Sequence, residues 1–145
     1  MIYIVDFGSQ VTQLIARRVR EAGVYCEIIS NNSLLINIEK TGCSGIIFSG
    51  GPASVHKANT PKIDKKAFNL NIPILGICYG MQLICHQLGG KVQLSKKREF
   101  GKTLIKPSKR SILFTGFNKG KTSNYVWMSH GDKVINLPKG FTSIA

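Results

Sequence analysis

Four short, largely apolar runs separated by longer segments constrain the fold of this chain more than any other feature. The runs cover residues 1–5, 25–29, 45–48 and 73–77. Runs of this length are typical of strands buried on both faces of a parallel sheet, and parallel strands need long crossovers, usually helices. The sequence therefore predicts an α/β fold with an open, mostly parallel sheet and helices on both faces.

Helical patterns occupy the connections between these runs. Ser9 is a good N-cap, and Gly23 stands where a helix commonly ends. Between them, five apolar residues fall on one predicted helical face: Val11, Leu14, Ile15, Val19 and Ala22. Further helices are predicted over residues 34–40, 61–70 and 79–88.

The last third of the chain has a different character. Beyond Val92 the helical pattern fades, and Gly- and Lys-rich turns separate predicted strands over residues 103–105, 111–114 and 125–128. Residues 141–145 have the pattern of a further strand. The length of 145 residues fits one domain, which we expect to span residues 1–145 and to be incomplete at its C-terminus.

Charge and composition narrow the class of protein. Twenty Lys and Arg residues against seven Asp and Glu give a net charge of +13. The basic residues are spread along the chain without interleaved aromatic residues, so we interpret them as a solvated surface and expect no nucleic-acid partner. No apolar run is long enough to cross a membrane, and no secretion signal precedes the first strand, which favours the cytoplasm.

One of the four cysteines has a special setting. Cys78 lies where a predicted strand meets a helix, in the pentapeptide Gly76-Ile77-Cys78-Tyr79-Gly80. This is the G-x-S-x-G nucleophile elbow with sulfur in place of oxygen. Glycine permits the sharp turn, and a helix N-terminus favours the thiolate, which is the attacking species. The alternative is a buried structural cysteine between two incidental glycines.

A glycine-rich loop, Gly50-Gly51-Pro52, follows the neighbouring predicted strand. Because the carboxyl ends of parallel strands share one edge of the sheet, we expect this loop to lie near Cys78. Its backbone N–H groups, together with that of Tyr79, would then stabilise an oxyanion. An ordinary turn is the alternative interpretation.

Both motifs resemble those of class I glutamine amidotransferases. Residues 76–82 are similar to the nucleophile motif of that family, and residues 49–52 are similar to its oxyanion loop. Residues 6–20, 98–101 and 127–134 resemble segments of one branch of the family, the GMP synthases. The resemblance runs along the whole chain and implies a flavodoxin-like fold whose C-terminal part is missing.

The resemblance also implies chemistry. Cys78 would attack the side-chain amide of L-glutamine, form a glutamyl thioester and release ammonia. Gly51 and Tyr79 would donate the oxyanion N–H groups. Three residues would hold the polar groups of glutamine: Gln82, Ser129 and His130.

In the complete family enzyme, ammonia passes to an ATP-pyrophosphatase domain, which uses ATP and magnesium to aminate xanthosine monophosphate to GMP. The resemblance therefore implies two partners for this chain, L-glutamine and that domain. It implies no cofactor and no metal within residues 1–145, and a homodimer for the complete enzyme.

The chain departs from the family in its catalytic triad. The family places a histidine and a glutamate in a later His-Pro-Glu segment, which this sequence lacks. None of the three histidines, His56, His86 and His130, is followed by a glutamate two residues later. Because losing one member of such a unit typically lowers the rate by orders of magnitude, we expect very weak glutaminase activity. A missing strand and helix would also leave an exposed edge and marginal stability.

Three rival hypotheses stay open at this point. The first is a catalytically incomplete fragment that binds glutamine or regulates a partner. The second is another amidotransferase, such as the anthranilate or carbamoyl-phosphate enzymes, against which residues 127–132 argue. The third is a basic nucleic-acid-binding protein, whose binding would weaken as salt is added.

Overall fold

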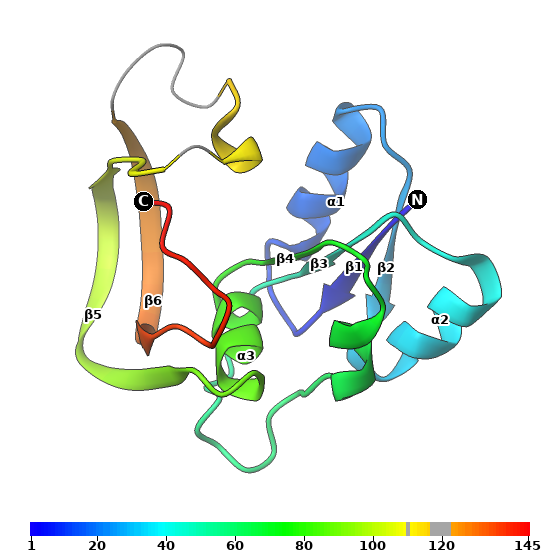
Figure 1. Cartoon of the computed structure of the whole chain (residues 1–145), viewed down its shortest axis with the longest axis horizontal. Helices are drawn as coiled ribbons and strands as arrows, with labels where there is room; N and C mark the ends of the chain where they lie inside the picture. The colour runs from blue at the N-terminus through cyan, green and yellow to red at the C-terminus, as the bar shows by residue number, and fades with distance from the viewer. Residues whose placement is uncertain (110, 117–122) are drawn as a thin grey trace.

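The computed structural model describes residues 1–109, 111–116 and 123–145, apart from the side chains of residues 95–100, 129 and 130. Two sheets organise this part of the chain, a four-stranded parallel sheet and a two-stranded antiparallel hairpin beside it (Figure 1). Among the described residues, the structure contains no helix with the length and apolar character needed to span a membrane.

The parallel sheet has the strand order β2-β1-β3-β4, which is the start of the flavodoxin-like order. Its strands are β1 (Ile2–Asp6), β2 (Cys26–Ser30), β3 (Gly45–Phe48) and β4 (Ile74–Gly76). The α-helices are α1 (Thr12–Glu21), α2 (Leu34–Thr41) and α3 (Tyr79–Gln87). Short 3₁₀ turns lie at η1 (Asn31–Ser33), η2 (Lys65–Asn69) and η3 (Ile112–Phe114), and the hairpin joins β5 (Lys91–Ile105) to β6 (Asn124–Asn136).

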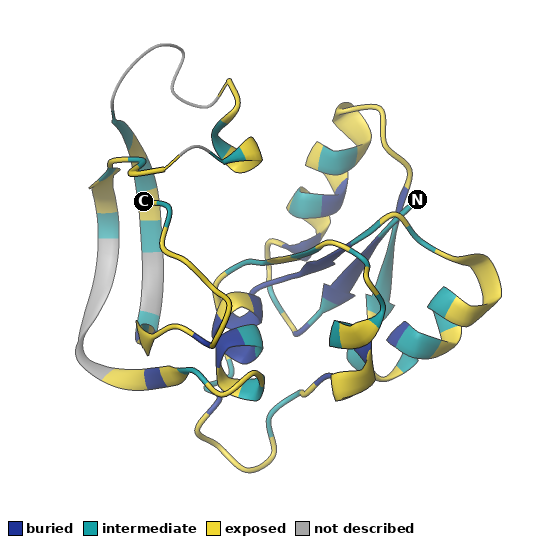
Figure 2. Ribbon diagram, viewed as in Figure 1, coloured by how far each residue is buried: buried dark blue, intermediate teal, exposed yellow. Residues whose placement is uncertain are grey.

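Helices cover both faces of the parallel sheet, as predicted. On one face, Val5 of β1 and Phe48 of β3 pack with Leu34 of α2 and Leu83 of α3. The smaller cluster on the other face lies under α1: Ile4, Ala16, Cys26 and Ile47. Figure 2 shows that the buried positions concentrate in the parallel sheet and α3. This two-sided burial explains why the strand sequences are apolar at consecutive positions.

The buried face of α1 differs from the predicted one. Thr12, Ile15, Ala16 and Val19 form the inward stripe, at the spacing i, i+3, i+4 and i+7. Leu14 lies outside that stripe and is exposed, as is Val11, which precedes the helix. Ala22, which follows the last residue of the helix, is exposed as well. The prediction was wrong for these three positions, because the buried polar Thr12 takes a place on the stripe that an apolar residue was expected to fill, and Val11 and Ala22 lie just outside the helix.

Asp6, rather than Ser9, makes most of the hydrogen bonds that hold the start of α1. Asp6 Oδ1 accepts from the N–H groups of Gly8 and Ser9 at 3.0 and 3.3 Å and from the Thr12 hydroxyl at 2.8 Å. Ser9 Oγ accepts from the Val11 N–H at 3.2 Å, one residue before the helix begins. The carboxylate at the end of β1 therefore fixes the turn that leads into α1.

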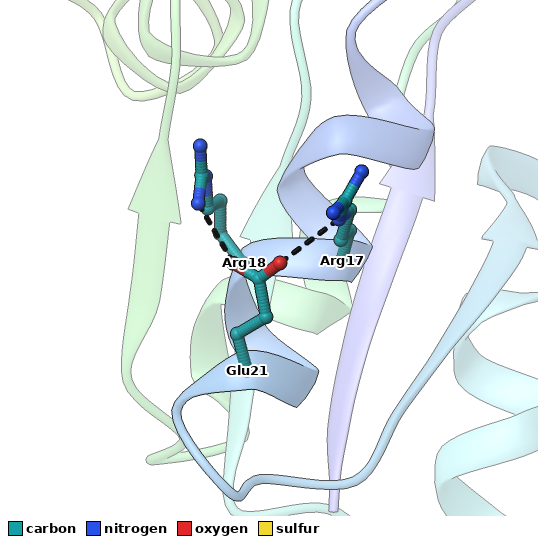
Figure 3. A network of polar contacts seen from close by, with 3 residues as sticks. All are labelled: Arg17, Arg18 and Glu21. Atoms are coloured by element: carbon teal, nitrogen blue, oxygen red, sulfur yellow. Dashed lines mark hydrogen bonds and ion pairs between the residues drawn. The ribbon is translucent and has the colours of Figure 1, made fainter.

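The solvent face of α1 carries a small charged network (Figure 3). Arg17 Nε lies 2.9 Å from Glu21 Oε1, and Arg18 Nη1 lies 2.8 Å from Glu21 Oε2. The hydrogen bond from Arg17, followed by that from Arg18, lowers the pKa of Glu21 below its ordinary value. All three side chains are solvent-accessible, so the network belongs to the surface of the helix.

Three predicted elements in the loops and tail were wrong. Residues 61–70 form only the turn η2, because the Tyr79 hydroxyl and the Gln87 amide hydrogen-bond the backbone of Pro61 and Ile63 and hold it extended. The predicted strand at 111–114 is the turn η3, since the Ser111 side chain accepts from the Leu113 N–H. Residues 141–145 form no strand.

β4 lies at one edge of the parallel sheet. Leu75 on this strand is 40% exposed, and a hollow of about 350 Å³ lies beside it, lined partly by Ile47 and Pro73. A second, smaller hollow of about 180 Å³ lies between β4, α3 and the segment after β6. The expected exposed apolar edge is therefore present along β4.

Candidate active site

Cys78 occupies the tight turn between β4 and α3. Its backbone has φ 49° and ψ −110°, in a region that residues other than glycine rarely adopt, and its side chain is exposed. Such a conformation costs free energy and persists only where the surroundings hold it, which is common at functional sites. This geometry agrees with a nucleophile elbow and excludes the alternative of a buried structural cysteine.

The two glycines of the elbow are required by close packing. A Cβ at Gly76 would lie 2.7 Å from the backbone nitrogen of Met81, in the first turns of α3. A Cβ at Gly80 would overlap the carbonyl oxygen of Phe48 and lie 2.6 Å from the Phe48 Cβ. Any larger residue would therefore push α3 away from β3 and displace Cys78, which sits between the two glycines.

Ser49 joins three loops at the carboxyl edge of the sheet. Its hydroxyl accepts from the Phe7 N–H at 3.3 Å, and its own N–H donates to the Val5 carbonyl at 3.1 Å. The Ser49 carbonyl accepts from the Gly80 N–H at 3.0 Å. This fully buried serine thus ties the loop after β1 and the elbow to the loop after β3, a role that the sequence motif alone did not reveal.

The glycine-rich loop lies directly against Cys78, as predicted. A Cβ at Gly50 would be only 3.5 Å from the Cys78 Cβ, so the two residues are neighbours. Within the described part of the chain, no acceptor receives the backbone N–H of Gly51 or of Tyr79. Tyr79 is the first residue of α3, where N–H groups have no partner inside the helix. Both N–H groups are thus available to a ligand, one directly after Cys78 in the chain and the other next to Gly50, the residue that lies against Cys78.

Asp132 connects the hairpin to both motifs of the site. Its side chain is buried, and its Oδ2 accepts from the Ser54 hydroxyl at 2.6 Å, just beyond the glycine-rich loop. Its backbone carbonyl accepts from Gln82 Nε2 at 2.9 Å, one helical turn after Cys78. One residue of β6 therefore holds the glycine-rich loop and the nucleophile helix at fixed positions relative to the hairpin.

The predicted glutamine-holding residues lie on these same two elements. Gln82 follows Cys78 by four residues, so both lie on one side of α3, and its side chain is buried at the hairpin contact. Ser129 and His130 lie on β6, where they pair with Phe100 and Glu99 of β5. Their side chains are outside the described part of the structure, so their contact with glutamine stays a prediction.

Two of the three histidines lie away from the sulfur. His86 follows Cys78 by eight residues, which corresponds to about 12 Å along the axis of α3. The His56 ring packs edge-on against His86, with 6.3 Å between ring centroids. The pair therefore sits toward the far end of the helix, and neither ring is placed to act as a base for Cys78. Nowhere in the described residues do three His, Cys, Asp or Glu side chains gather as a metal site would require.

Cys85 provides an internal contrast to Cys78. It lies in the same helix but is buried, and its Sγ donates to the Asn136 carbonyl at 3.4 Å. Burial raises the pKa of the Cys85 thiol. Burial likewise raises the pKa of the Tyr79 phenol, whose hydroxyl donates to the Pro61 carbonyl at 2.5 Å. Among these groups, the exposed Cys78 is the accessible nucleophile.

Sequence comparisons agree with this geometry. The profile of the family described as glutamine amidotransferase class I matches residues 3–145. The chain is 52% identical over 144 residues to the glutamine-hydrolysing GMP synthase of Aquifex aeolicus, and 54% identical over 144 residues to that of Agrobacterium fabrum. Each match covers 99% of this chain but only 28% and 27% of the relative, so the chain spans about a quarter of the length of these enzymes.

Solved structures give the same result. The chain superimposes on a protein of Thermoplasma acidophilum described as a GMP synthase subunit, with a TM-score of 0.78 and 35% identity, covering 99% of this chain and 70% of that one. A glutamine amidotransferase of Thermotoga maritima shares the fold, with a TM-score of 0.70 and 20% identity, over 99% of this chain and 65% of that one. From its elbow, its glycine-rich loop and a profile match along nearly its whole length, the chain belongs to the class I glutamine amidotransferase family.

Proposed function

We propose that this chain is the glutamine-hydrolysing part of a GMP synthase, with Cys78 as its nucleophile. The observation that carries the proposal is the exposed Cys78 at positive φ, held between β4 and α3 against the Gly50-Gly51 loop. The 51–54% identity to GMP synthases supports this branch over the anthranilate and carbamoyl-phosphate enzymes.

The proposed reaction begins with attack of the Cys78 thiolate on the side-chain carbonyl carbon of L-glutamine. The carbonyl π electrons move to oxygen, and the N–H groups of Gly51 and Tyr79 stabilise the resulting oxyanion. When the oxyanion collapses, the C–N bond breaks, and the nitrogen takes up a proton and leaves as ammonia. Water then hydrolyses the Cys78 thioester to glutamate and regenerates the thiol.

Gln82, Ser129 and His130 are the proposed glutamine-holding residues. Gln82 uses one N–H of its side-chain amide on the Asp132 carbonyl, which leaves the amide oxygen and the second N–H for a substrate. Ser129 and His130 lie on β6 two or three residues before Asp132, which is fixed to the glycine-rich loop. The hairpin would thus close over glutamine bound at Cys78.

Proton transfer limits the proposed activity of the 145 residues on their own. His56 and His86 lie away from the sulfur, and the sequence has no His-Pro-Glu segment. Without an adjacent base, the thiolate fraction and the protonation of the leaving nitrogen both depend on water, so the rate would fall by about three to four orders of magnitude. We therefore propose slow but Cys78-dependent hydrolysis.

The released ammonia would serve the amination of xanthosine monophosphate to GMP in the longer enzyme. ATP and magnesium would belong to that synthetase portion and not to residues 1–145. The relatives are more than three times longer than this chain, which supports a synthetase portion as its partner.

Release of labelled ammonia from glutamine that carries ¹⁵N in its side-chain amide tests the proposal. The expected result is slow release by the wild-type chain, loss of release in Cys78→Ala and unchanged release in Cys85→Ala. Hydrolysis that persists in Cys78→Ala would contradict the assignment. A chain that binds glutamine but releases no ammonia would favour the second candidate, a binding or regulatory fragment, which the missing His-Pro-Glu segment motivates.

A further inference from the structure

The outer part of the hairpin carries four side chains on one face that no function has yet used. We name them the hairpin strip: Lys102, Leu104, Tyr125 and Trp127. Lys102 pairs with Trp127 and Leu104 pairs with Tyr125 in the antiparallel register. Directly paired side chains have their Cβ atoms about 5 Å apart, so the four form one continuous patch. Lys102 Nζ also lies 4.5 Å from the centre of the Tyr125 ring, which is a cation–π contact.

The side chains of the hairpin strip are highly exposed, although three of the four are aromatic or aliphatic. Trp127 is 81% exposed, Tyr125 is 58% exposed and Leu104 is 42% exposed. On the opposite face of the hairpin, the apolar residues Ile105, Val126 and Met128 are only partly exposed, and the exposed residue there is the polar Thr103. Contiguous exposed apolar side chains are typical of protein interaction sites, and Trp and Tyr are the residues that contribute most to such interfaces.

The charge around the strip indicates what kind of partner fits it. Among the described side chains of residues 91–136, the one acid, Asp132, is buried, whereas five lysines are exposed: Lys91, Lys102, Lys106, Lys109 and Lys133. Asp132 is buried and takes the hydrogen bond from Ser54, so it does not offset the basic surface. Lys102, Lys106 and Lys109, which lie along or just beyond β5, are all exposed. A matching surface would have an apolar pocket for Trp127 within an acidic rim.

The strip lies on the element that is fixed to the nucleophile helix. β6 carries Tyr125 and Trp127 near its start and Asp132 near its end, and Asp132 contacts Gln82 and Ser54. A protein bound to the strip would therefore stand at a defined position relative to Cys78. The hairpin is a two-stranded sheet separate from the parallel sheet (Figure 1), so a partner can cover its outer face without disturbing the core.

We propose that the hairpin strip is the surface on which the synthetase portion of GMP synthase docks, with Trp127 inserted into an apolar pocket inside an acidic rim. The inference rests on the proposed function, because it takes the synthetase as the partner. In the relatives, the region that matches this chain makes up only about 28% of the length. The rest of each relative is the protein that such a surface would contact.

The single tryptophan of the chain makes the test direct. The full chain labelled with 5-fluorotryptophan gives one ¹⁹F signal, which reports on Trp127 alone. It is titrated with the synthetase protein that complements the Thermoplasma acidophilum relative, which is itself 35% identical to this chain. We expect the free signal to respond to replacement of H₂O by D₂O, and we expect the bound signal to shift and lose that response.

Variants sharpen the test. Trp127→Ala is expected to weaken the Kd by about ten-fold or more, and Lys102→Glu to weaken it in a salt-dependent way. Leu14→Ala is the matched control, because Leu14 is exposed on α1, away from the hairpin, and its loss should leave the Kd unchanged.

Several results overturn the proposal. A complex that forms without moving the ¹⁹F signal, a Kd unchanged by Trp127→Ala, or no complex at millimolar concentration each rejects the surface. A signal that shifts with the concentration of the chain alone assigns the strip to self-association instead. Cys78-dependent ammonia release, measured on the same samples, stays positive in all these cases if only the docking surface is wrong, and so separates this failure from failure of the proposed function.

Discussion

The parallel sheet and the hairpin contribute to the same site by different means. The sheet sets the position of Cys78 through local rules: a buried strand ends, a glycine permits close packing, and a helix begins. The hairpin contributes Asp132 through contacts between residues more than forty positions apart in the chain. The position of the nucleophile is therefore set at one edge of the sheet, whereas its alignment with β6, which carries two of the proposed glutamine-holding residues, depends on a few long-range hydrogen bonds.

The largest effect is expected where α3 packs on the parallel sheet, at Gly80. Gly80→Ala should lower the free energy of unfolding by about 3 kcal/mol, because the new Cβ would overlap the Phe48 backbone, which cannot move away cheaply. Gly45→Ala is the matched control, since the nearest atoms to a Cβ there are 3.8 Å away. Urea unfolding monitored by circular dichroism compares them. Equal stability of the two variants would show that α3 is not packed on β3 as described.

A smaller effect is expected at the contact between the sheet and the hairpin. Asp132→Ala should cost about 2 kcal/mol of unfolding free energy, because it leaves the Ser54 hydroxyl without its charged acceptor. Ser54→Ala should cost about 1 kcal/mol, and the double variant should cost less than the sum of the two. A coupling energy near zero in this double-mutant cycle would mean that the two side chains do not interact.

Alkaline pH should lower the free energy of unfolding gradually. Burial raises the pKa values of Cys85 and Tyr79 above their ordinary values of 9.0 and 10.0. The folded chain therefore holds these protons more tightly than the unfolded chain, so their stabilising contribution is complete below pH 9 and is lost as the pH rises through the folded-state values. Urea midpoints measured from about pH 7 to 11 should fall above about pH 9, and Cys85→Ala should reduce the slope. A midpoint that stays constant or rises over this range would be inconsistent with buried, protonated groups.

The smallest effect is expected on the surface of α1. Glu21→Gln removes both ion pairs of Figure 3, yet all three side chains are exposed and screened by water. The urea midpoint at neutral pH should therefore be unchanged within error. The lowered pKa of Glu21 means that its small contribution is present above pH 4.5 and is lost at lower pH. A loss at neutral pH as large as that of Ser54→Ala would contradict this ranking.

Much of the sheet and of the elbow could be predicted because the signals are local. The strand sequences, Cys78 and its flanking glycines lie within short windows, and steric rules relate each window to its structure. Residues 61–63 show where that approach stops, because the side chains of Tyr79 and Gln87 hold this segment extended against its helical pattern. No local pattern predicts the hydrogen-bond partners of Asp132, since Ser54 and Gln82 lie in distant segments of the chain.

The exposed faces were also beyond local prediction. The α1 stripe was misplaced because Thr12, a polar residue, is buried against Asp6. The hairpin strip could not be predicted from the sequence, because Lys102 and Trp127 become neighbours only when β5 and β6 pair. Both cases depend on contacts between segments, which a pattern within one segment does not contain.

Intact-mass analysis after treatment with a glutamine-mimicking diazoketone tests most directly whether Cys78 is an activated, accessible nucleophile beside a glutamine pocket. We expect a single adduct on the wild-type chain, none on Cys78→Ala and one on Cys85→Ala. Excess glutamine is expected to protect the wild-type chain from labelling. An unlabelled wild-type chain, or an adduct that persists in Cys78→Ala, would contradict the assignment of Cys78 as the nucleophile.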